Sequence, residues 1–190
     1  MPKKPRLSLI VPTRNRSASL ERLERSVAKH TKDYELLVIG GDDGYNIKVN
    51  RGLAAAKGEY IILMHDDHTV TPHWADVLAE VGSFRYGENK DSFDHYGGYY
   101  RPHEGYCLSP DEHPQYPSAL CISKRALKRV GFMDEYYREP GFQDVDMGYQ
   151  IADAGYYITC LPGKIIHWAE RSGPLNEDNR DYLHAKWRIE

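Results

Sequence analysis

Hydrophobic residues along this chain form short continuous runs that alternate with stretches of helical spacing. Apolar runs at residues 7–11, 34–39 and 60–64 predict strands buried on both faces, because a half-exposed strand would alternate apolar and polar residues. Helical spacing follows the first two runs, at residues 17–30 and 48–57. This βαβαβ order predicts a parallel sheet with right-handed crossover connections.

The periodicity is weaker from residue 82 to 117 and then returns. Further strands are predicted at 93–100, 118–122, 156–161 and 164–167. Ser123 and Gly131 bound a predicted helix, a second helix begins near Gln143 and ends at Gly155, and a short one is predicted at 182–188. The whole pattern indicates one α/β domain.

The cluster His65-Asp66-Asp67-His68 follows the apolar run 60–64 with no turn residue between, and Thr71-Pro72 then looks like a helix start. The acids therefore lie at the carboxyl end of a central strand, where open α/β sheets bind ligands. A solvated acidic turn would explain an isolated Asp pair. Directly after a buried strand, a site for Mg²⁺ or Mn²⁺, or for phosphate, is the better interpretation.

Three further features bear on chemistry. Asp144 and Asp146 fall in the first turn of a predicted helix, where favourable interaction with the helix dipole would by itself explain acidic residues. His167 ends a strand as His65 does, although a strand-end histidine is more often structural. Neither G-x-G-x-x-G nor a P-loop is present, so bound phosphates would be held mainly through a cation.

Composition narrows the class of partner. The formal net charge of −3 gives no reason to expect nucleic acid. The 15 Tyr and 9 His residues suggest either a groove for a polar ligand or a protein interface. Cys107, Cys121 and Cys160 have no metal-ligand spacing and read as reduced thiols. With no apolar run of membrane-spanning length and a first strand too early for a signal peptide, a cytoplasmic protein is expected.

Several stretches together resemble the family 2 glycosyltransferases, which have the GT-A fold. They are IVPTRNR at 10–16, YELLVI at 34–39, NRGLAAAKGEYI at 50–61, HDD at 65–67, SALCISKRALKRVGFMDE at 118–135 and QDVDMGYQIADAGY at 143–156. Each motif alone is weak, but the ordered set is specific.

The resemblance implies a single GT-A-like domain with a mostly parallel central sheet flanked by helices. Residues 7–81 would form the nucleotide-sugar-binding half, 82–168 the acceptor and catalytic half, and 169–190 a mobile C-terminal segment. The implied activity is inverting transfer of a sugar from a nucleoside-diphosphate donor, with UDP as the expected nucleotide, to a glycan or other hydroxyl acceptor.

The resemblance also implies roles for individual residues. Those expected to bind the nucleotide sugar are Pro12, Thr13, Arg14, Asn15, Asp42, Asn50, His65 and Asp66. Asp67 and His167 would hold Mn²⁺ or Mg²⁺, and Asp144 would be the catalytic base. The chain departs from the family pattern at three positions. Gly40 stands where an acid usually contacts the nucleobase, unless a local shift brings in Asp42. His65 replaces the first acid of the D-x-D motif, and Gln143 replaces the acid that commonly precedes the catalytic base.

Other functions compete with this interpretation. A sugar-nucleotide pyrophosphorylase would carry a G-x-G-T-R-type loop after the first strand, and Pro12-Thr13-Arg14-Asn15 argues against it. A metal-dependent phosphoester or nucleotide-sugar hydrolase could use the same His and Asp cluster. A catalytically degenerate sugar-nucleotide-binding domain would account for the departures at Gly40 and His65.

Overall fold

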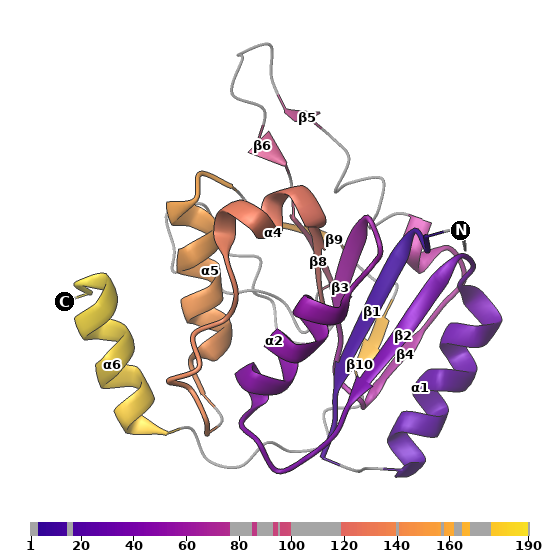
Figure 1. Ribbon diagram of the computed structural model, residues 1–190, viewed down its shortest axis with the longest axis horizontal. Helices are drawn as coiled ribbons and strands as arrows, with labels where there is room; N and C mark the ends of the chain where they lie inside the picture. Colours follow the sequence, from indigo (N-terminus) through magenta and orange to yellow (C-terminus); the bar gives the residue numbers. More distant parts are fainter. Residues whose placement is uncertain are drawn as a thin grey trace.

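A six-stranded sheet forms the centre of the computed structural model (Figure 1). The structure describes residues 4–14, 17–76, 85–86, 93–94, 96–99, 119–139, 141–156, 158–161, 165–167 and 176–189. The strands, in their order across the sheet, are β2 (Tyr34–Ile39), β1 (Leu7–Pro12), β3 (Tyr60–Leu63), β8 (Ala119–Ser123), β7 (Tyr96–Tyr99) and β9 (Ile158–Leu161). Only β8 runs antiparallel to its neighbours within this sheet. The expected mostly parallel α/β sheet is confirmed.

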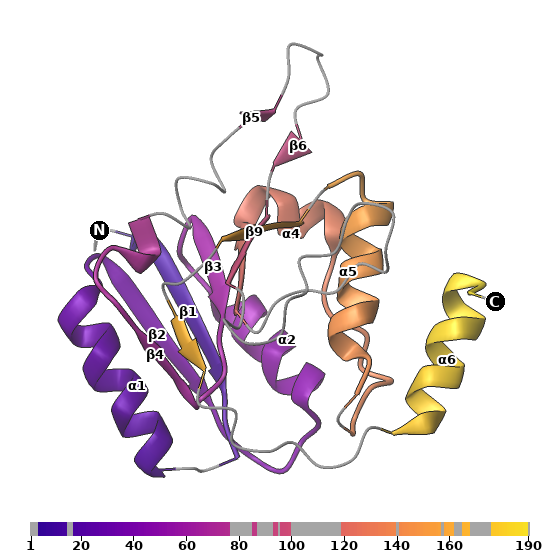
Figure 2. The same ribbon diagram turned by 180° about the vertical axis from the view of Figure 1, so that it is seen from behind.

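Helices and a small second sheet cover the two faces (Figures 1 and 2). On one face lie α2 (Tyr45–Ala55), α4 (Lys124–Val130) and α5 (Gln143–Asp153). On the other lie α1 (Ser17–His30) and the antiparallel pair of β4 (His68–Val70) with β10 (Ile165–His167). A two-stranded ribbon of β5 (Arg85–Tyr86) and β6 (Phe93–Asp94) and the helix α6 (Glu177–Trp187) complete the described elements.

The core has two halves because successive strand side chains point to opposite faces. Leu9 and Ile62 pack with Leu23 of α1, whereas their neighbours Ile10 and Ile61 face α2, α4 and α5. All five side chains have no exposed surface. The apolar runs of β1 and β3 therefore are strands buried on both faces, as the sequence predicts. The same prediction is wrong for residues 34–39, because β2 lies at the edge of the sheet and is only half-buried at each position.

Two glycines let α2 approach its neighbours closely. Gly52 lies against the Ile10 side chain, where an added Cβ would overlap it. At Gly44, just before the helix, an added Cβ would lie 2.8 Å from the Cα of Arg138. The C-terminal half of α2 therefore packs closely on β1, and its N-terminal end packs on the loop that precedes α5.

Some element boundaries differ from the sequence-based expectation. The strand β4 begins at His68, inside the segment that is expected to be a polar cluster and a loop. A helix is predicted from Pro72, and the described residues include a short helical piece of it at 74–76. The helices α2 and α6 begin earlier than predicted, at Tyr45 and Glu177. Among the described residues, no helix has the length and apolar character needed to cross a bilayer.

Candidate active site

The candidate site lies at the edge of the sheet where β1, β2 and β3 end. Because these strands are parallel, their carboxyl ends share one edge, which is the lower edge in Figure 1. Thr13 follows β1, Gly41 and Asp42 follow β2, and the segment His65–His68 follows β3. The start of α5, which carries Asp144, faces the same side in Figure 1.

A buried hydrogen bond joins the ends of β1 and β3. The Thr13 hydroxyl donates to Oδ2 of Asp66 over 2.7 Å, and both side chains are buried. A hydrogen bond to a carboxylate is stronger than one between neutral groups. It therefore fixes the loop after β1 against the acidic cluster.

Lys48 of α2 links the segments that follow β1 and β2. Its ammonium donates to the carbonyl oxygen of Thr13 over 2.9 Å and to that of Gly41 over 3.4 Å, and its side chain is 4% exposed. Burial lowers the pKa of Lys48, and the nearby positive charge of Arg14 lowers it further. The neighbouring carboxylate of Asp66 raises the pKa but does not cancel these effects. The positive charge of Lys48, held next to the ends of β1 and β2, favours binding of a negatively charged ligand at this edge of the sheet.

His65, Asp67 and His68 form a group with the donor atoms of a metal site. One ligand atom from each lies within 4.8 Å of the others. Atoms that share one first-row ion at about 2.1 Å lie roughly 3 to 4 Å apart, so small side-chain adjustments would suffice. The imidazole rings of His65 and His68 stack at 5.1 Å, and Asp67 is 2% exposed. The residues therefore fit a divalent cation.

His167 lies beside this group in the backbone. The register of the β4–β10 pair sets His167 directly opposite His68. This position suits the predicted role of His167 as a second metal ligand, which stays a prediction. The same register explains how a residue from the end of the chain reaches a cluster that follows β3.

Asp144 lies in the first turn of α5. Its Oδ1 accepts a hydrogen bond from the Val145 N–H over 2.9 Å, and burial raises the pKa of the carboxyl above its usual value. The helix is preceded by Gly141 and Phe142, both in the left-handed region, with φ of 120° and 65°. A strained non-glycine residue, here Phe142, and a carboxyl with a raised pKa are both features that concentrate at functional sites, while the role of Asp144 as the base stays a prediction.

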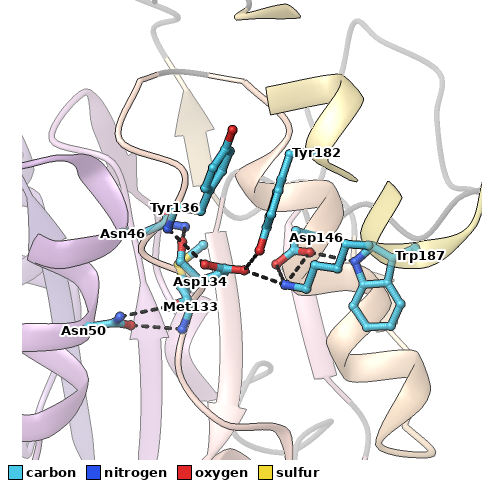
Figure 3. A network of polar contacts seen from close by, with 9 residues as sticks. Asn46, Asn50, Met133, Asp134, Tyr136, Asp146, Tyr182 and Trp187 are labelled. Carbon is cyan, nitrogen blue, oxygen red and sulfur yellow. Dashed lines mark hydrogen bonds and ion pairs between the residues drawn. The ribbon is translucent and has the colours of Figure 1, made fainter. Parts of the chain in front are cut away.

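Asp134 and Asp146 are engaged elsewhere. Lys186 of α6 donates to Oδ2 of Asp134 over 2.8 Å and to Oδ2 of Asp146 over 2.9 Å (Figure 3). The Tyr182 hydroxyl also donates to Asp134, and the Trp187 indole N–H to Asp146. Residues two apart on a helix do not face each other, so Asp144 points away from the side where Asp146 meets α6.

The remaining predicted site residues have varied surroundings. Pro12 is buried at the end of β1, whereas Arg14 and Asp42 are exposed. Asn50 is buried, and its side-chain amide exchanges two hydrogen bonds with the backbone of Met133, at 2.8 and 2.9 Å. Asn15 lies outside the described residues. The nucleotide-binding roles of these residues stay predictions.

The structure adds Lys48 and His68 to the predicted set, and it groups His65 with the metal-binding candidates. A lysine at the start of a helix usually indicates a solvated face, and its sequence position alone did not suggest burial. The sequence did indicate His68, because it is the last residue of the H-D-D-H cluster. The structure was needed to show that His68, as the first residue of β4, has a ring nitrogen close to the Asp67 carboxylate.

The sequence comparisons agree with the resemblance to family 2 glycosyltransferases. Residues 40–86 match the family described as Glycosyl transferase family 2. A stretch of 62 residues is 31% identical to the chondroitin synthase of Pasteurella multocida (strain Pm70) and covers 33% of this chain. The chain spans only 6% of the length of that relative.

Solved structures share the fold. The catalytic domain of Drosophila beta1,4-galactosyltransferase 7 in complex with xylobiose superposes with a TM-score of 0.61 at 18% identity, covering 94% of this chain and 79% of that one. A mutant of the same enzyme, with manganese, UDP-Gal and xylobiose, gives 0.60 at 16% identity, covering 93% and 78%. S. aureus TarS in complex with UDP-GlcNAc gives 0.67 at 12% identity, covering 95% and 66%. The expected GT-A-like architecture is confirmed.

Proposed function

We propose that this chain, which has a family 2 glycosyl transferase sequence over residues 40–86 and the fold of GT-A glycosyltransferases, transfers a sugar from a nucleoside-diphosphate donor to an acceptor hydroxyl. The observation that carries the proposal is the group His65, Asp67 and His68 beside the Thr13–Asp66 hydrogen bond. It offers metal-binding and polar groups at the one edge of the sheet where parallel strands end. The proposed donor nucleotide is UDP, the nucleotide of the sugars bound in two similar structures.

The donor would lie along this edge. The loop after β1 would hold the base and ribose, with Lys48 beneath it contributing positive charge toward the diphosphate. His65, Asp67 and His68, with His167 beside them in the backbone register, would hold Mn²⁺ or Mg²⁺. Such a cation neutralises the charge that gathers on a leaving diphosphate. Two imidazoles favour Mn²⁺ over Mg²⁺.

Transfer would proceed as a single displacement with inversion. Asp144 takes the proton of the acceptor hydroxyl, whose oxygen forms a bond to the anomeric carbon as the bond from that carbon to the diphosphate breaks. The products are the glycosylated acceptor, a protonated Asp144 and the nucleoside diphosphate. The raised pKa of Asp144 suits a group that must accept a proton.

Donor titration followed by a product assay tests the proposal. Calorimetry with UDP-, dTDP- and GDP-sugars, in Mn²⁺ and in its absence, should show metal-dependent binding of one donor. With that donor, release of nucleotide that requires an added sugar acceptor supports transfer. Equal release without any acceptor would support the hydrolase alternative, which the His-rich group also fits. Binding with neither reaction would indicate a degenerate binding domain.

The variant Asp67→Asn tests the metal group directly. It should weaken donor binding in Mn²⁺ by about 10-fold or more while leaving affinity for the bare nucleoside nearly intact, since amides are poorer metal ligands than carboxylates. Asp43→Asn is the matched control, because Asp43 pairs on the surface with Arg51 and is exposed. An Asp67 variant that binds the donor as tightly as the parent would contradict the assignment.

A further inference from the structure

The helix α6 packs on the chain around Asp144 through both aromatic and polar contacts. Tyr182 stacks on Tyr136 with ring centroids 3.7 Å apart, and Trp187 stacks on Tyr149 at 5.3 Å. The helix side chains also donate hydrogen bonds to acceptors on the loop before α5 and on the first turn of α5, as Figure 3 shows for Tyr182 and Trp187. The aromatic contacts supply packing, and the directional hydrogen bonds fix how the two segments are placed relative to each other.

Lys186 is the centre of this attachment. Its ammonium lies 2.8 Å from Oδ2 of Asp134 and 2.9 Å from Oδ2 of Asp146, so one cation bridges two carboxylates from different segments. Burial alone would lower the pKa of Lys186, but the hydrogen bonds that its ammonium donates to the two carboxylates, and their negative charges, raise it. Lys186 therefore stays charged at neutral pH and keeps both acids paired.

A second contact holds the other side of the same turn. The Asn179 amide donates to the carbonyl oxygens of Glu139 and Gly141, each over 3.0 Å. Gly141 immediately precedes Phe142, whose left-handed backbone begins α5. Contacts from α6 thus reach the chain at residues 134, 139, 141 and 146, on both sides of Asp144.

We propose that α6 is a clamp on the catalytic turn and that Lys186 is its positioning residue, holding the loop before α5 and the first turn of α5 in the arrangement that directs Asp144 toward the acceptor. The proposal rests on the proposed function, since it concerns the same carboxylate. Lys186 itself does not touch the reacting atoms. It acts through Asp134 and Asp146, and its loss would leave two acids near Asp144 without their shared cation.

Kinetics of Lys186→Met in the full chain test this role. Misplacing a reacting group by about 1 Å costs up to ~10²-fold, so kcat for transfer should fall by about 10- to 100-fold while donor affinity stays unchanged. Lys186→Arg should recover most of kcat, because a guanidinium can also bridge two carboxylates. Arg180→Met is the control on the same helix, since Arg180 contacts only the exposed Asp181 among the pairs described. It should leave kcat as it is.

Folding is checked by circular dichroism, and rates are compared well below each melting temperature. A folded Lys186→Met with parental kcat and only a lower melting temperature would overturn the proposal. If that variant does not fold, Tyr182→Phe decides, because it removes one hydrogen bond to Asp134 and keeps the ring stacked on Tyr136. A lowered kcat there supports the clamp, and a parental kcat overturns it. Parental transfer by Asp144→Asn would instead refute the assigned base, and with it the proposed mechanism.

Discussion

The Asp144 carboxylate lies where burial disfavours its ionised form, yet a catalytic base must be ionised to accept a proton. Burial raises its pKa, and hydrogen bonds from the backbone N–H groups of Val145 and of Asp144 itself oppose that shift only in part. The cost of the buried charge grows as pH rises from the unfolded pKa of about 3.9 and is complete above the higher folded pKa. At neutral pH the ionised Asp144 therefore reduces the stability of the fold.

Replacing Asp144 with Asn should separate activity from stability. Without a proton acceptor, single-turnover transfer should fall by about 10²- to 10⁴-fold with little change in donor affinity. Asp144 is half-buried, so removing its charge should leave the melting temperature at pH 7 unchanged or slightly raised, and the difference should vanish near pH 3. A lower melting temperature with normal turnover would mean that Asp144 serves the helix start instead.

The Thr13 hydroxyl should matter for both stability and donor binding. Thr13→Val keeps the shape but leaves the buried Asp66 carboxylate without this donor. The expected loss is about 1–3 kcal/mol of unfolding free energy, with weaker donor affinity because the loop after β1 loses its tie to the cluster. Thr13→Ser keeps the hydroxyl and is the matched control. Urea unfolding and calorimetry measure the two effects, and parental values for Thr13→Val would contradict the role given to this bond.

Residues at strand ends could be predicted from the sequence, while those placed by packing could not. Thr13 and Asp67 follow apolar runs directly, so their place at one edge follows from a parallel sheet. Lys48 is different, because its burial depends on how closely α2 approaches β1 at Gly52. No local pattern around Lys48 contains that information.

At the scale of elements, the N-terminal end of α2 connects the two halves of the site. Asn46 donates to the carbonyl oxygen of Asp134 over 2.6 Å, and Asn50 is hydrogen-bonded to Met133 one turn later (Figure 3). These contacts join the helix that follows β2 to the loop that leads to Asp144. The distance between the proposed nucleotide-binding segments after β1 and β2 and the proposed base Asp144 therefore depends on these hydrogen bonds.

Adding one methyl group at Gly44 should disturb that spacing. The Cβ of Gly44→Ala would lie 2.8 Å from the Cα of Arg138 and 3.0 Å from its carbonyl oxygen, and backbone cannot rotate away as a side chain can. Since the φ of −55° at Gly44 suits alanine, the effect would come from the contact alone. We expect a loss of about 1–3 kcal/mol in urea unfolding and a lower transfer rate. An unchanged unfolding midpoint would show that the loop moves at no cost.

Element prediction succeeded where the sequence has a long apolar run or a clear helical period, and failed where it has neither. The strands β1 and β3 are apolar runs in contact with both core halves, so their pattern is unambiguous. β4 has three residues, and its partner among the described strands is β10, which lies far along the chain, so nothing local predicts it. The sequence of α6 has no apolar stripe, since the buried residues of this helix are Asn179 and Leu183, although the cap at Asn176 marks its start.

For the whole molecule, the paired acids and lysine around α6 predict how its attachment depends on pH. Burial raises the pKa of Asp134, but the hydrogen bonds from Lys186, the Tyr136 N–H and Tyr182 outweigh it and hold the pKa below its usual value. This stabilisation is present above the unfolded pKa of about 3.9 and is lost as pH falls through the folded value. The raised pKa of Lys186 acts in the opposite direction: its contribution is present below about 10.4 and is lost as pH rises through the folded value.

Helix α6 should accordingly stay attached between roughly pH 4 and 10.4 and loosen outside that window. Trp187, which donates to Asp146 and stacks on Tyr149 at 5.3 Å, can report the change by its fluorescence. Lys186→Met should remove the alkaline transition. A transition near neutral pH in the parent would contradict this account.

The pairing of β10 with β4 also sets an order in time. A chain emerging from the ribosome can form β1, β2 and β3 early, since they are close in sequence. The strand β4, which contains His68, can pair with β10 only after residues 165–167 have been synthesised. Closing so long a loop is entropically costly and comes late. A nascent chain from which residues 165–167 have not yet emerged would therefore hold β1, β2 and β3 without the strand that pairs with β4, so that the proposed cation site would be completed only after β10 has been released from the ribosome.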